Sequence, residues 1–408
     1  MNGKMESALE GITVLDLSSG IVGPYTTKLF ADLGARVLKV ERPKGDPSRL
    51  MGPWLNNEEG VESSGTYQFL NTNKESIVID LSKKQAYPVI TNLMGQVDLV
   101  VTSFSPANAE KYRLAPSDIR ALTDVNTLAI TNFGWTGPYR DFTISETVLY
   151  AMGGEMYSHG IAGQAPLKLG GVAALMQCGA MGAIGALGAI HAHELHNITQ
   201  EVDISLFDVQ INSVDRRSST ILAFRFSGRM QERPEAGGLY LIGGVYACAD
   251  GFVEVTGGVN SSHPYWSRVT DMIGDPRLKE SKWGDLDFIR KPEAKSEADA
   301  IVVPWMIERT REEIWSAARE ARVILAPLFT GKDLATDKVF NERGLWVEVE
   351  HDLLGKFPML GRPYIFEKTP WEIRRPAPML GEDTDKILGE CGYGSAEIKD
   401  LRLEEIVR

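Results

Sequence analysis

Short apolar segments rich in β-branched residues alternate with helical patterns along the first third of the chain. Residues 12–17 (Ile-Thr-Val-Leu-Asp-Leu) are typical of a buried parallel strand. A helical pattern runs from about Tyr25 to Leu33 and ends at Gly34, and a second strand is predicted over 35–40. Because crossover connections are right-handed, we expect the two strands to be parallel neighbours in one sheet.

The same alternation continues beyond this first unit. Strands are predicted over 76–80, 98–102 and 128–131, and a helix from about Lys83 to Met94 lies between the first two. Strands that alternate with helices favour a doubly wound α/β sheet. Ligands bind such sheets at the turns that end the strands, so a binding site is expected there.

The length of 408 residues exceeds what one compact core holds and favours two domains. After about residue 225 turn signals become frequent, and short strands alternate with amphipathic helices. The tail from about Lys332 is Pro-rich and irregular, becomes helical near Glu397, and is expected to return to the first domain. We predict a discontinuous, large Rossmann-like domain over 1–224 and 328–408, and a small α+β domain over 225–327.

Charge and cysteine content exclude several classes of protein. The net charge of −12 argues against nucleic acid or an anionic membrane as a partner, and no apolar run suggests a membrane span. Cys178, Cys248 and Cys391 show neither metal-ligand spacing nor a disulfide framework, so we expect no metal and a reducing cytoplasm. A local cationic pocket for a phosphorylated ligand stays compatible with this composition.

A segment rich in alanine and glycine runs from Leu175 to His193, with glycines at 179, 182, 185 and 188. On a helix this spacing leaves a smooth stripe that a second backbone can approach closely. Each glycine weakens an isolated helix by roughly 1 kcal/mol relative to alanine, so tight packing must compensate. The pattern therefore predicts a buried core helix.

Five sequence blocks occur in order along the chain. They are residues 9–17 with Gly23-Pro24 and 32–43, then 69–74, 133–139, 201–208, and finally Phe366, Thr369-Pro370 and 378–384. Each block is weak alone, but together they resemble the family III CoA-transferases, of the formyl-CoA and carnitine CoA-transferase type. The resemblance extends from Leu9 to the C-terminus.

This resemblance implies an interlocked dimer, in which each chain forms a ring threaded through the other. It also implies a covalent aspartate nucleophile four residues before Gly179, where this chain has Leu175. An isobutyl group has no lone pair and cannot attack a thioester, so nucleophilic catalysis by this residue is excluded. Cys178 is better explained as a small buried residue than as a substitute. A racemase branch of the family uses a histidine where this chain has 144–146, and that histidine is missing.

The resemblance also assigns residues to coenzyme A. The positions implied to face it are Gly20, Ile21, Val22, Arg42, Asn71, Asn73, Lys74, Phe104 and Lys111. Coenzyme A needs backbone N–H groups and cations for its phosphates and an apolar slot for its adenine, and these residue types supply them. Arg42 and Lys111 are otherwise explained as solvated surface charges. Glu146 matches an acidic position near the family's active site. Gly237-Gly238 and Gly243-Gly244 are either oxyanion-steadying loop glycines or plain turn glycines.

Two further stretches depart from the family pattern, at 103–107 and 196–200, where glycines and basic residues are lost. We therefore expect a non-catalytic subunit of a heteromeric CoA-transferase whose homologous partner supplies the aspartate. Its substrates are CoA thioesters, and no cofactor is bound permanently. Two-subunit members imply a donor such as succinyl-CoA and an acceptor such as (R)-benzylsuccinate. The alternatives are a self-sufficient enzyme with a displaced nucleophile, and a CoA-binding scaffold or regulatory subunit without turnover.

Overall fold

The computed structural model describes residues 7–212, 215–230, 233, 241–258 and 260–408. The chain divides into a large unit, which comprises 1–155, 168–229 and 341–408, and a small unit, which comprises 156–167 and 230–340. The domains predicted from the sequence, 1–224 with 328–408 and 225–327, stay a prediction.

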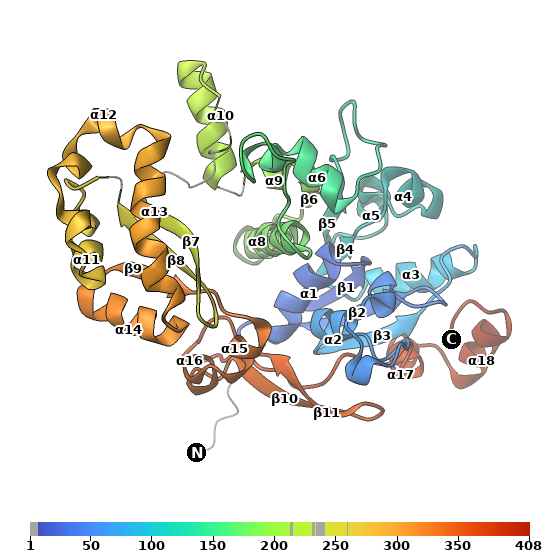
Figure 1. The fold of residues 1–408 in the computed structure, drawn as a ribbon. Coiled ribbons are helices and arrows are strands. Elements are labelled where there is room, and N and C mark those ends of the chain that lie inside the picture. Colours follow the sequence, from blue (N-terminus) through green and yellow to red (C-terminus); the bar gives the residue numbers. More distant parts are fainter. Residues whose placement is uncertain (1–6, 213–214, 231–232, 234–240, 259) are drawn as a thin grey trace. The chain divides into compact units, whose positions relative to one another are not determined.

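Six parallel strands form the central sheet of the large unit, in the order β3-β2-β1-β4-β5-β6 (Figure 1). They are β1 Thr13–Leu17, β2 Arg36–Glu41, β3 Lys74–Val78, β4 Leu99–Thr102, β5 Asn126–Thr131 and β6 Glu201–Ser205. β1 pairs with β2 on one side and with β4 on the other, so the strand order reverses between β1 and β4. This order is that of a doubly wound nucleotide-binding sheet, and the predicted α/β class is confirmed.

Helices cover both faces of this sheet because successive strand residues point to opposite sides. On one face Leu15 and Val100 pack against α3, α5, α17 and α18 in one apolar core, and on the other face α8 contacts α1, β5 and β6. The helices of the large unit are α1 Val22–Asp32, α2 Gly65–Asn71, α3 Ala86–Met94, α4 Pro106–Tyr112, α5 Pro116–Leu122, α6 Glu146–Met152, α8 Ala173–His196, α9 Leu206–Asn212, α10 Asp215–Ser227, α17 Thr384–Glu390 and α18 Ser395–Leu403, and α7 Glu155–Ser158 begins at the unit boundary.

The glycine stripe of α8 packs against α1, as its spacing predicts. A Cβ atom at Gly179 would lie 2.7 Å from the Val22 carbonyl oxygen, and one at Gly182 would lie 2.8 Å from Thr26 Oγ1. The Thr26 hydroxyl also donates a hydrogen bond of 2.8 Å to the Gly179 carbonyl. Among the described helices, α8 is the one that is long and apolar enough to cross a membrane, but a core helix passes the same test.

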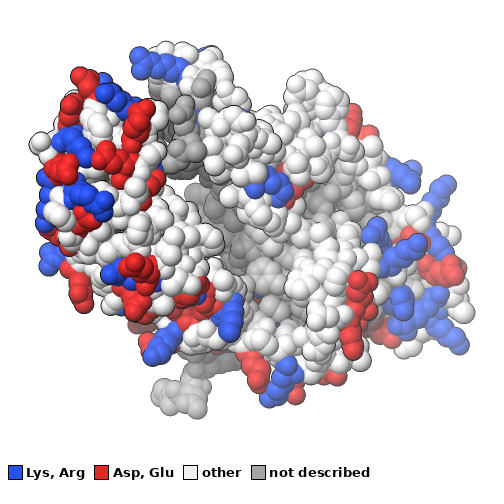
Figure 2. Space-filling model, in the orientation of Figure 1, with Lys and Arg blue, Asp and Glu red and all other residues white. Residues whose placement is uncertain are grey.

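The small unit contains an antiparallel sheet in the order β7-β8-β9. Its core includes Trp266, Trp283 and Val302. On the face drawn in Figure 2, acidic and basic side chains are interspersed over this unit. Its elements are β7 Ile242–Cys248, β8 Gly251–Gly258, α11 Pro264–Ile273, α12 Leu286–Ile289, α13 Pro292–Ile307, α14 Arg311–Ala321, β9 Ile324–Pro327 and α15 Gly331–Thr336, and α16 Lys338–Glu342 ends beyond the unit boundary.

The C-terminal segment returns to the large unit. Its first part is an antiparallel hairpin of β10 Trp346–His351 and β11 Gly355–Leu360, so the expectation of an irregular segment was wrong here. The outward residues of β10, Glu348 and Glu350, are polar and exposed, which makes the strand hard to recognise from local sequence. Near the chain end, the Asp80 N–H donates to the Ile406 carbonyl at 2.8 Å, which fixes the last residues beside β3.

Candidate functional site

The turns after β1 and β4 meet where the strand order reverses. The Ser19 N–H donates to the Ser103 hydroxyl at 2.9 Å and the Gly20 N–H donates to Asp46 Oδ1 at 3.2 Å. Gly20 has a φ of +79°, a conformation that other residues rarely adopt. Both N–H groups are thus occupied by protein acceptors. A ligand at this loop would have to bind the N–H groups in the first turn of α1, which begins at Val22.

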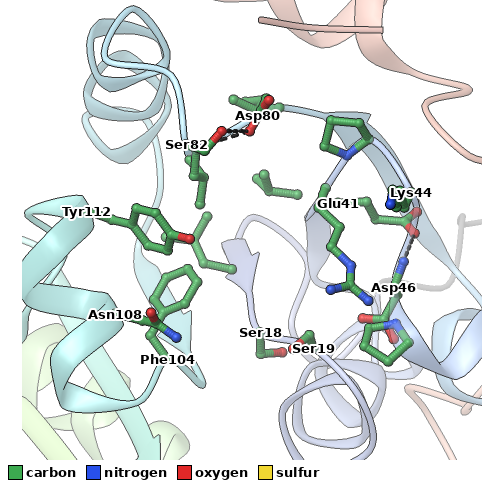
Figure 3. A pocket seen from close by; sticks show the side chains of 17 residues that line it. Ser18, Ser19, Glu41, Lys44, Asp46, Asp80, Ser82, Phe104, Asn108 and Tyr112 are labelled. Atoms are coloured by element: carbon green, nitrogen blue, oxygen red, sulfur yellow. Dashed lines mark hydrogen bonds between the residues drawn. The ribbon is translucent and has the colours of Figure 1, made fainter.

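A cavity of about 500 Å³ opens beside these turns; we name it the Arg42 cavity. Residues that follow β1, β2, β3 and β4 all contribute to its wall, together with α4. Figure 3 shows the rings of Phe104 and Tyr112 across the cavity from Glu41 and Lys44. The lining residues are Leu17, Ser18, Ser19, Val40, Glu41, Arg42, Pro43, Lys44, Asp46, Pro47, Ile79, Asp80, Leu81, Ser82, Phe104, Asn108 and Tyr112.

Two acidic residues that line the Arg42 cavity, Glu41 and Asp46, are neutralised by buried cations. The buried Arg49 donates to both carboxylate oxygens of Glu41, each at 2.8 Å, and Lys39 Nζ lies 3.0 Å from Asp46 Oδ2. Arg42 and Lys44, by contrast, form no ion pair with any described residue, and Arg42 Nε donates only to the Gly45 carbonyl at 2.8 Å. The cavity therefore presents two cations without an ion pair against one such carboxylate, Asp80, and this excess of positive charge suits an anionic ligand.

A buried charge network supports the turn after β1. Asp16 Oδ2 lies 3.1 Å from Lys74 Nζ and 3.9 Å from Lys39 Nζ, and all three side chains are fully buried. Burial alone would raise the pKa of Asp16, but Lys39, Lys74 and the Ser18 and Thr27 hydroxyls lower it below its usual value. Burial, with repulsion from Lys39, outweighs the attraction of Asp16 and lowers the pKa of Lys74 to about 7. The network therefore holds the turn after β1 in place. Its charges are paired with one another, so none of them is free to bind a ligand in the cavity.

A second cavity of about 520 Å³ surrounds Leu175; we name it the Leu175 cavity. It shares Ser19 and Phe104 with the Arg42 cavity, so the two adjoin at the turns after β1 and β4. Leu175 lies in the first turn of α8 and is half-buried. The lining residues are Ser19, Ile21, Val22, Ser103, Phe104, Ser105, Pro106, Ala107, Ile130, Thr131, Asn132, Arg140, Asp141, Phe142, Thr143, Leu175 and Leu206.

The described residues around Leu175 offer no ready nucleophile. Cys178 is fully buried, and burial raises the pKa of its thiol to about 12, so it stays protonated at neutral pH. Asp203 Oδ2 accepts the Trp135 N–H at 3.0 Å, which gives it a structural role, and burial raises its pKa. Asp141 is the one carboxylate among the described residues that line the Leu175 cavity, and it forms an ion pair of 3.4 Å with Arg140.

The structure divides the residues implied to face coenzyme A. Arg42 and Phe104 line the Arg42 cavity, and Ile21, Val22 and Phe104 line the Leu175 cavity. Lys111 lines a third cavity of about 450 Å³, the Lys111 cavity, together with Lys83, Lys84 and Arg113; it shares Leu81, Ser82 and Tyr112 with the Arg42 cavity. Figure 2 shows Lys and Arg side chains gathered on the part of the large unit that carries α3 and α4.

Asn71, Asn73 and Lys74 line none of these three cavities. Asn71 accepts from Lys74 Nζ at 2.9 Å, and Asn73 Nδ2 donates to Asp32 at 2.9 Å. All three are buried among protein partners. The role assigned to them by resemblance stays a prediction, and their contacts here are structural.

Glu146 begins α6 and forms an ion pair of 3.0 Å with Lys168, whose ammonium also donates to the carbonyls of Leu169 and Gly171. The pair ties α6 to the segment that leads into α8. Gly237 and Gly238 lie outside the described residues, and Gly243 and Gly244 lie in β7, so the proposed oxyanion-binding loop stays a prediction.

Sequence reasoning missed the residues after β3. Ile79, Asp80, Leu81 and Ser82 line the Arg42 cavity, and Asp80 Oδ1 accepts hydrogen bonds from the Ser82 N–H and hydroxyl (Figure 3). The signal was available, because the strand predicted over 76–80 ends here and ligands bind beyond the carboxyl ends of parallel strands.

The comparisons decide the family. The model of CoA-transferase family III matches residues 9–384. The chain belongs to CoA-transferase family III. The resemblance recognised from the sequence blocks is thus confirmed.

Known family III proteins cover the chain almost completely. It is 28% identical to succinyl-CoA:(R)-benzylsuccinate CoA-transferase subunit BbsE of Thauera aromatica, over 95% of each chain. It is 26% identical to the succinyl-CoA–L-malate CoA-transferase alpha subunit of Chloroflexus aurantiacus, over 99% of this chain and 94% of that one. A CaiB/BaiF family protein from Brucella suis has the same fold, with a TM-score of 0.83 and 23% identity over 94% of this chain and 99% of that chain.

Proposed function

We propose that this family III chain is the nucleophile-free subunit of a heteromeric, cytoplasmic CoA-transferase. It binds a CoA thioester, and a homologous subunit supplies the aspartate that reacts. The observation that carries the proposal is Leu175, an aliphatic side chain in a cavity that adjoins the cationic Arg42 cavity and holds no available nucleophile.

The two adjoining cavities match the two halves of coenzyme A. The phosphates belong with Arg42 and Lys44, because these cations have no acidic partner among the described residues. The adenine ring belongs against Phe104 and Tyr112, whose rings meet edge to face with centroids 5.6 Å apart. The pantetheine arm then passes Ser19 and Phe104, the residues that both cavities share, and the thioester lies near Leu175.

The names of the relatives support a partner subunit, because BbsE and the malate-specific alpha subunit are each named as a subunit. By the same analogy the donor is an acyl-CoA such as succinyl-CoA and the acceptor is a carboxylic acid such as (R)-benzylsuccinate.

The partner's aspartate attacks the thioester carbonyl, and the C–S bond breaks to give a mixed anhydride and CoA thiolate. The thiolate then attacks the aspartyl carbonyl and releases the donor acid. The acceptor carboxylate attacks the resulting aspartyl thioester, and the thiolate finally takes the acceptor's acyl group and frees the aspartate.

One alternative has a specific residue behind it. Asp141 is the candidate for a displaced nucleophile, since it is the one carboxylate among the described residues that line the Leu175 cavity. Its side chain is 65% exposed and paired with Arg140. An exposed, ion-paired carboxylate is well hydrated and therefore a weaker nucleophile than one in a dry site.

The experiment separates reaction from binding. The full chain, purified without any partner, is incubated with succinyl-CoA and then with hydroxylamine, and intact-mass spectrometry follows. We expect no hydroxamate, whereas calorimetry shows one CoA bound per chain. Arg42→Gln weakens CoA binding by about tenfold, and the exposed control Arg319→Gln leaves it unchanged. A hydroxamate on the chain that Asp141→Asn abolishes would establish the displaced nucleophile instead, and absence of CoA binding would refute a retained site.

A further inference from the structure

Four aromatic rings gather beside the Leu175 cavity. The centroid of Phe133 lies 5.6 Å from that of Tyr139, 6.3 Å from that of Phe142 and 5.5 Å from that of Phe207. Tyr139 and Phe142 also contact one another, with centroids 5.1 Å apart. Phe133 is buried, whereas Phe142 is 53% exposed and lines the cavity. The cluster thus ends in an aromatic face that the described residues of the large unit leave partly exposed.

The position of Phe142 is fixed by its loop. Its N–H donates to the Tyr139 carbonyl at 2.9 Å, and its carbonyl accepts from Asn132 Nδ2 at 3.1 Å. The start of the loop is held by Asp203, which accepts the Trp135 N–H at 3.0 Å. A ring placed in advance by its backbone loses little freedom when it contacts a ligand, so it contributes more of its packing energy to binding.

The charges of the Leu175 cavity cancel. Arg140 is the one cation among the described lining residues, and it pairs with Glu110 and with Asp141. The remaining lining side chains are apolar or carry hydroxyl and amide groups. A terminal carboxylate placed here would lose water without gaining a free cation, which is costly.

We propose that the Leu175 cavity selects CoA thioesters whose acyl group carries an aromatic ring, with Phe142 as the specificity-determining residue. The inference rests on the proposed function, because the acyl group reaches the cavity only on a bound CoA thioester. It goes further by ranking acyl groups in this cavity: an aryl ring favours binding, and a free carboxylate, as in succinyl-CoA, opposes it. The aryl ring packs against Phe142 and Leu175, and its burial strengthens binding by about tenfold over an acetyl group.

Calorimetry on the full chain tests this selectivity with four probes: CoA, acetyl-CoA, succinyl-CoA and phenylacetyl-CoA. We expect phenylacetyl-CoA to bind about tenfold more tightly than acetyl-CoA, and succinyl-CoA to bind no more tightly than acetyl-CoA. Equal affinities for phenylacetyl-CoA and acetyl-CoA would overturn the inference and leave the proposed function standing. If none of the four probes binds, both fail.

A pair of variants locates the selectivity. Phe142→Ala is expected to remove the tenfold preference for phenylacetyl-CoA over acetyl-CoA. The matched control is Phe366→Ala, because Phe366 is 43% exposed, contacts Tyr364 with centroids 5.1 Å apart, and lines none of the three cavities. A preference that survives Phe142→Ala, or that Phe366→Ala removes to the same extent, contradicts the assignment. Circular dichroism confirms that both variants are folded.

Discussion

Two regions at the carboxyl ends of the same sheet handle charge in opposite ways. Beneath the turn after β1, Asp16 is fully buried between Lys39 and Lys74, and each charge has a partner. Around Leu175, at the position where the resemblance implies a reactive carboxylate, the side chain is aliphatic and the neighbouring charges cancel. The comparison teaches that buried charge in this chain holds the turn in shape, while the position implied for the nucleophile carries no charge of its own.

Removing the central carboxylate tests the charged region and has the largest expected effect. Asp16→Ala leaves Lys74 and Lys39 without the anion between them, so we expect the free energy of unfolding to fall by about 3–5 kcal/mol. Urea unfolding measures the change. The control Glu348→Ala breaks an exposed pair with Lys356 and should change stability by less than about 1 kcal/mol. Equal effects of the two variants would show that the buried network is not needed.

Packing behind Leu175 is the next test, because α8 presents that residue. Gly179→Ala places a methyl group 2.7 Å from the Val22 carbonyl oxygen, and we expect it to lower the free energy of unfolding by about 1–3 kcal/mol. The exposed Gly188 has no atom within 4 Å of a Cβ, so Gly188→Ala should stabilise the helix by up to about 1 kcal/mol. Both values come from urea midpoints, and a stabilising Gly179→Ala would refute the close approach of α1.

A carboxylate placed at position 175 would give the Leu175 region a charged group, as the region around Asp16 already has. We expect Leu175→Asp and Leu175→Asn each to lower the free energy of unfolding by about 1–2 kcal/mol, because both replace a half-buried apolar side chain by a polar group. Only the aspartate variant should gain a hydroxylamine-sensitive adduct with an acyl-CoA, detected by mass spectrometry. An inert aspartate variant that still binds CoA would mean that the thioester does not reach this position.

The charged region should also make the stability of the chain depend on pH. The pKa of Lys74 is about 7 in the folded chain and about 10.4 when unfolded. Between these values the unfolded chain binds more protons, so Lys74 makes the free energy of unfolding rise with pH by up to about 1.4 kcal/mol per pH unit. This contribution is full above the unfolded pKa and is lost as the pH falls toward 7.

Its neighbours do not alter the sign in this range. The pKa of Lys39 is raised by Asp46, Asp16 and Glu41 against the effect of burial, and the pKa of Asp16 is lowered, so both keep their charge between pH 7 and 9. Urea midpoints at pH 7, 8 and 9 should rise for the unaltered chain, and the rise should vanish in Lys74→Met. A parallel rise in both proteins would assign the dependence to other groups.

Local patterns in the sequence were enough for the framework of the large unit. Strands β1, β2, β4 and β5 and the helix α8 were predicted within a few residues, because buried apolar runs and glycine spacing are local signals. β6 was not recognised as a strand, since its outward residues are polar and exposed. The hairpin of β10 and β11 was missed for a similar reason.

For the candidate site, too, some features followed from local sequence and others needed the tertiary structure. Sequence determined by itself that Leu175 cannot act as a nucleophile, because that depends on the chemistry of one side chain. It also located Arg42 and Phe104 beyond strand ends. Only the tertiary structure decided that Asn71, Asn73 and Lys74 turn into the interior, that Ile79–Ser82 line the cavity instead, and that Phe142 faces Leu175's cavity. The physical reason is that strand order and side-chain direction bring together residues far apart in the chain, and no local pattern encodes which partner each buried charge will find.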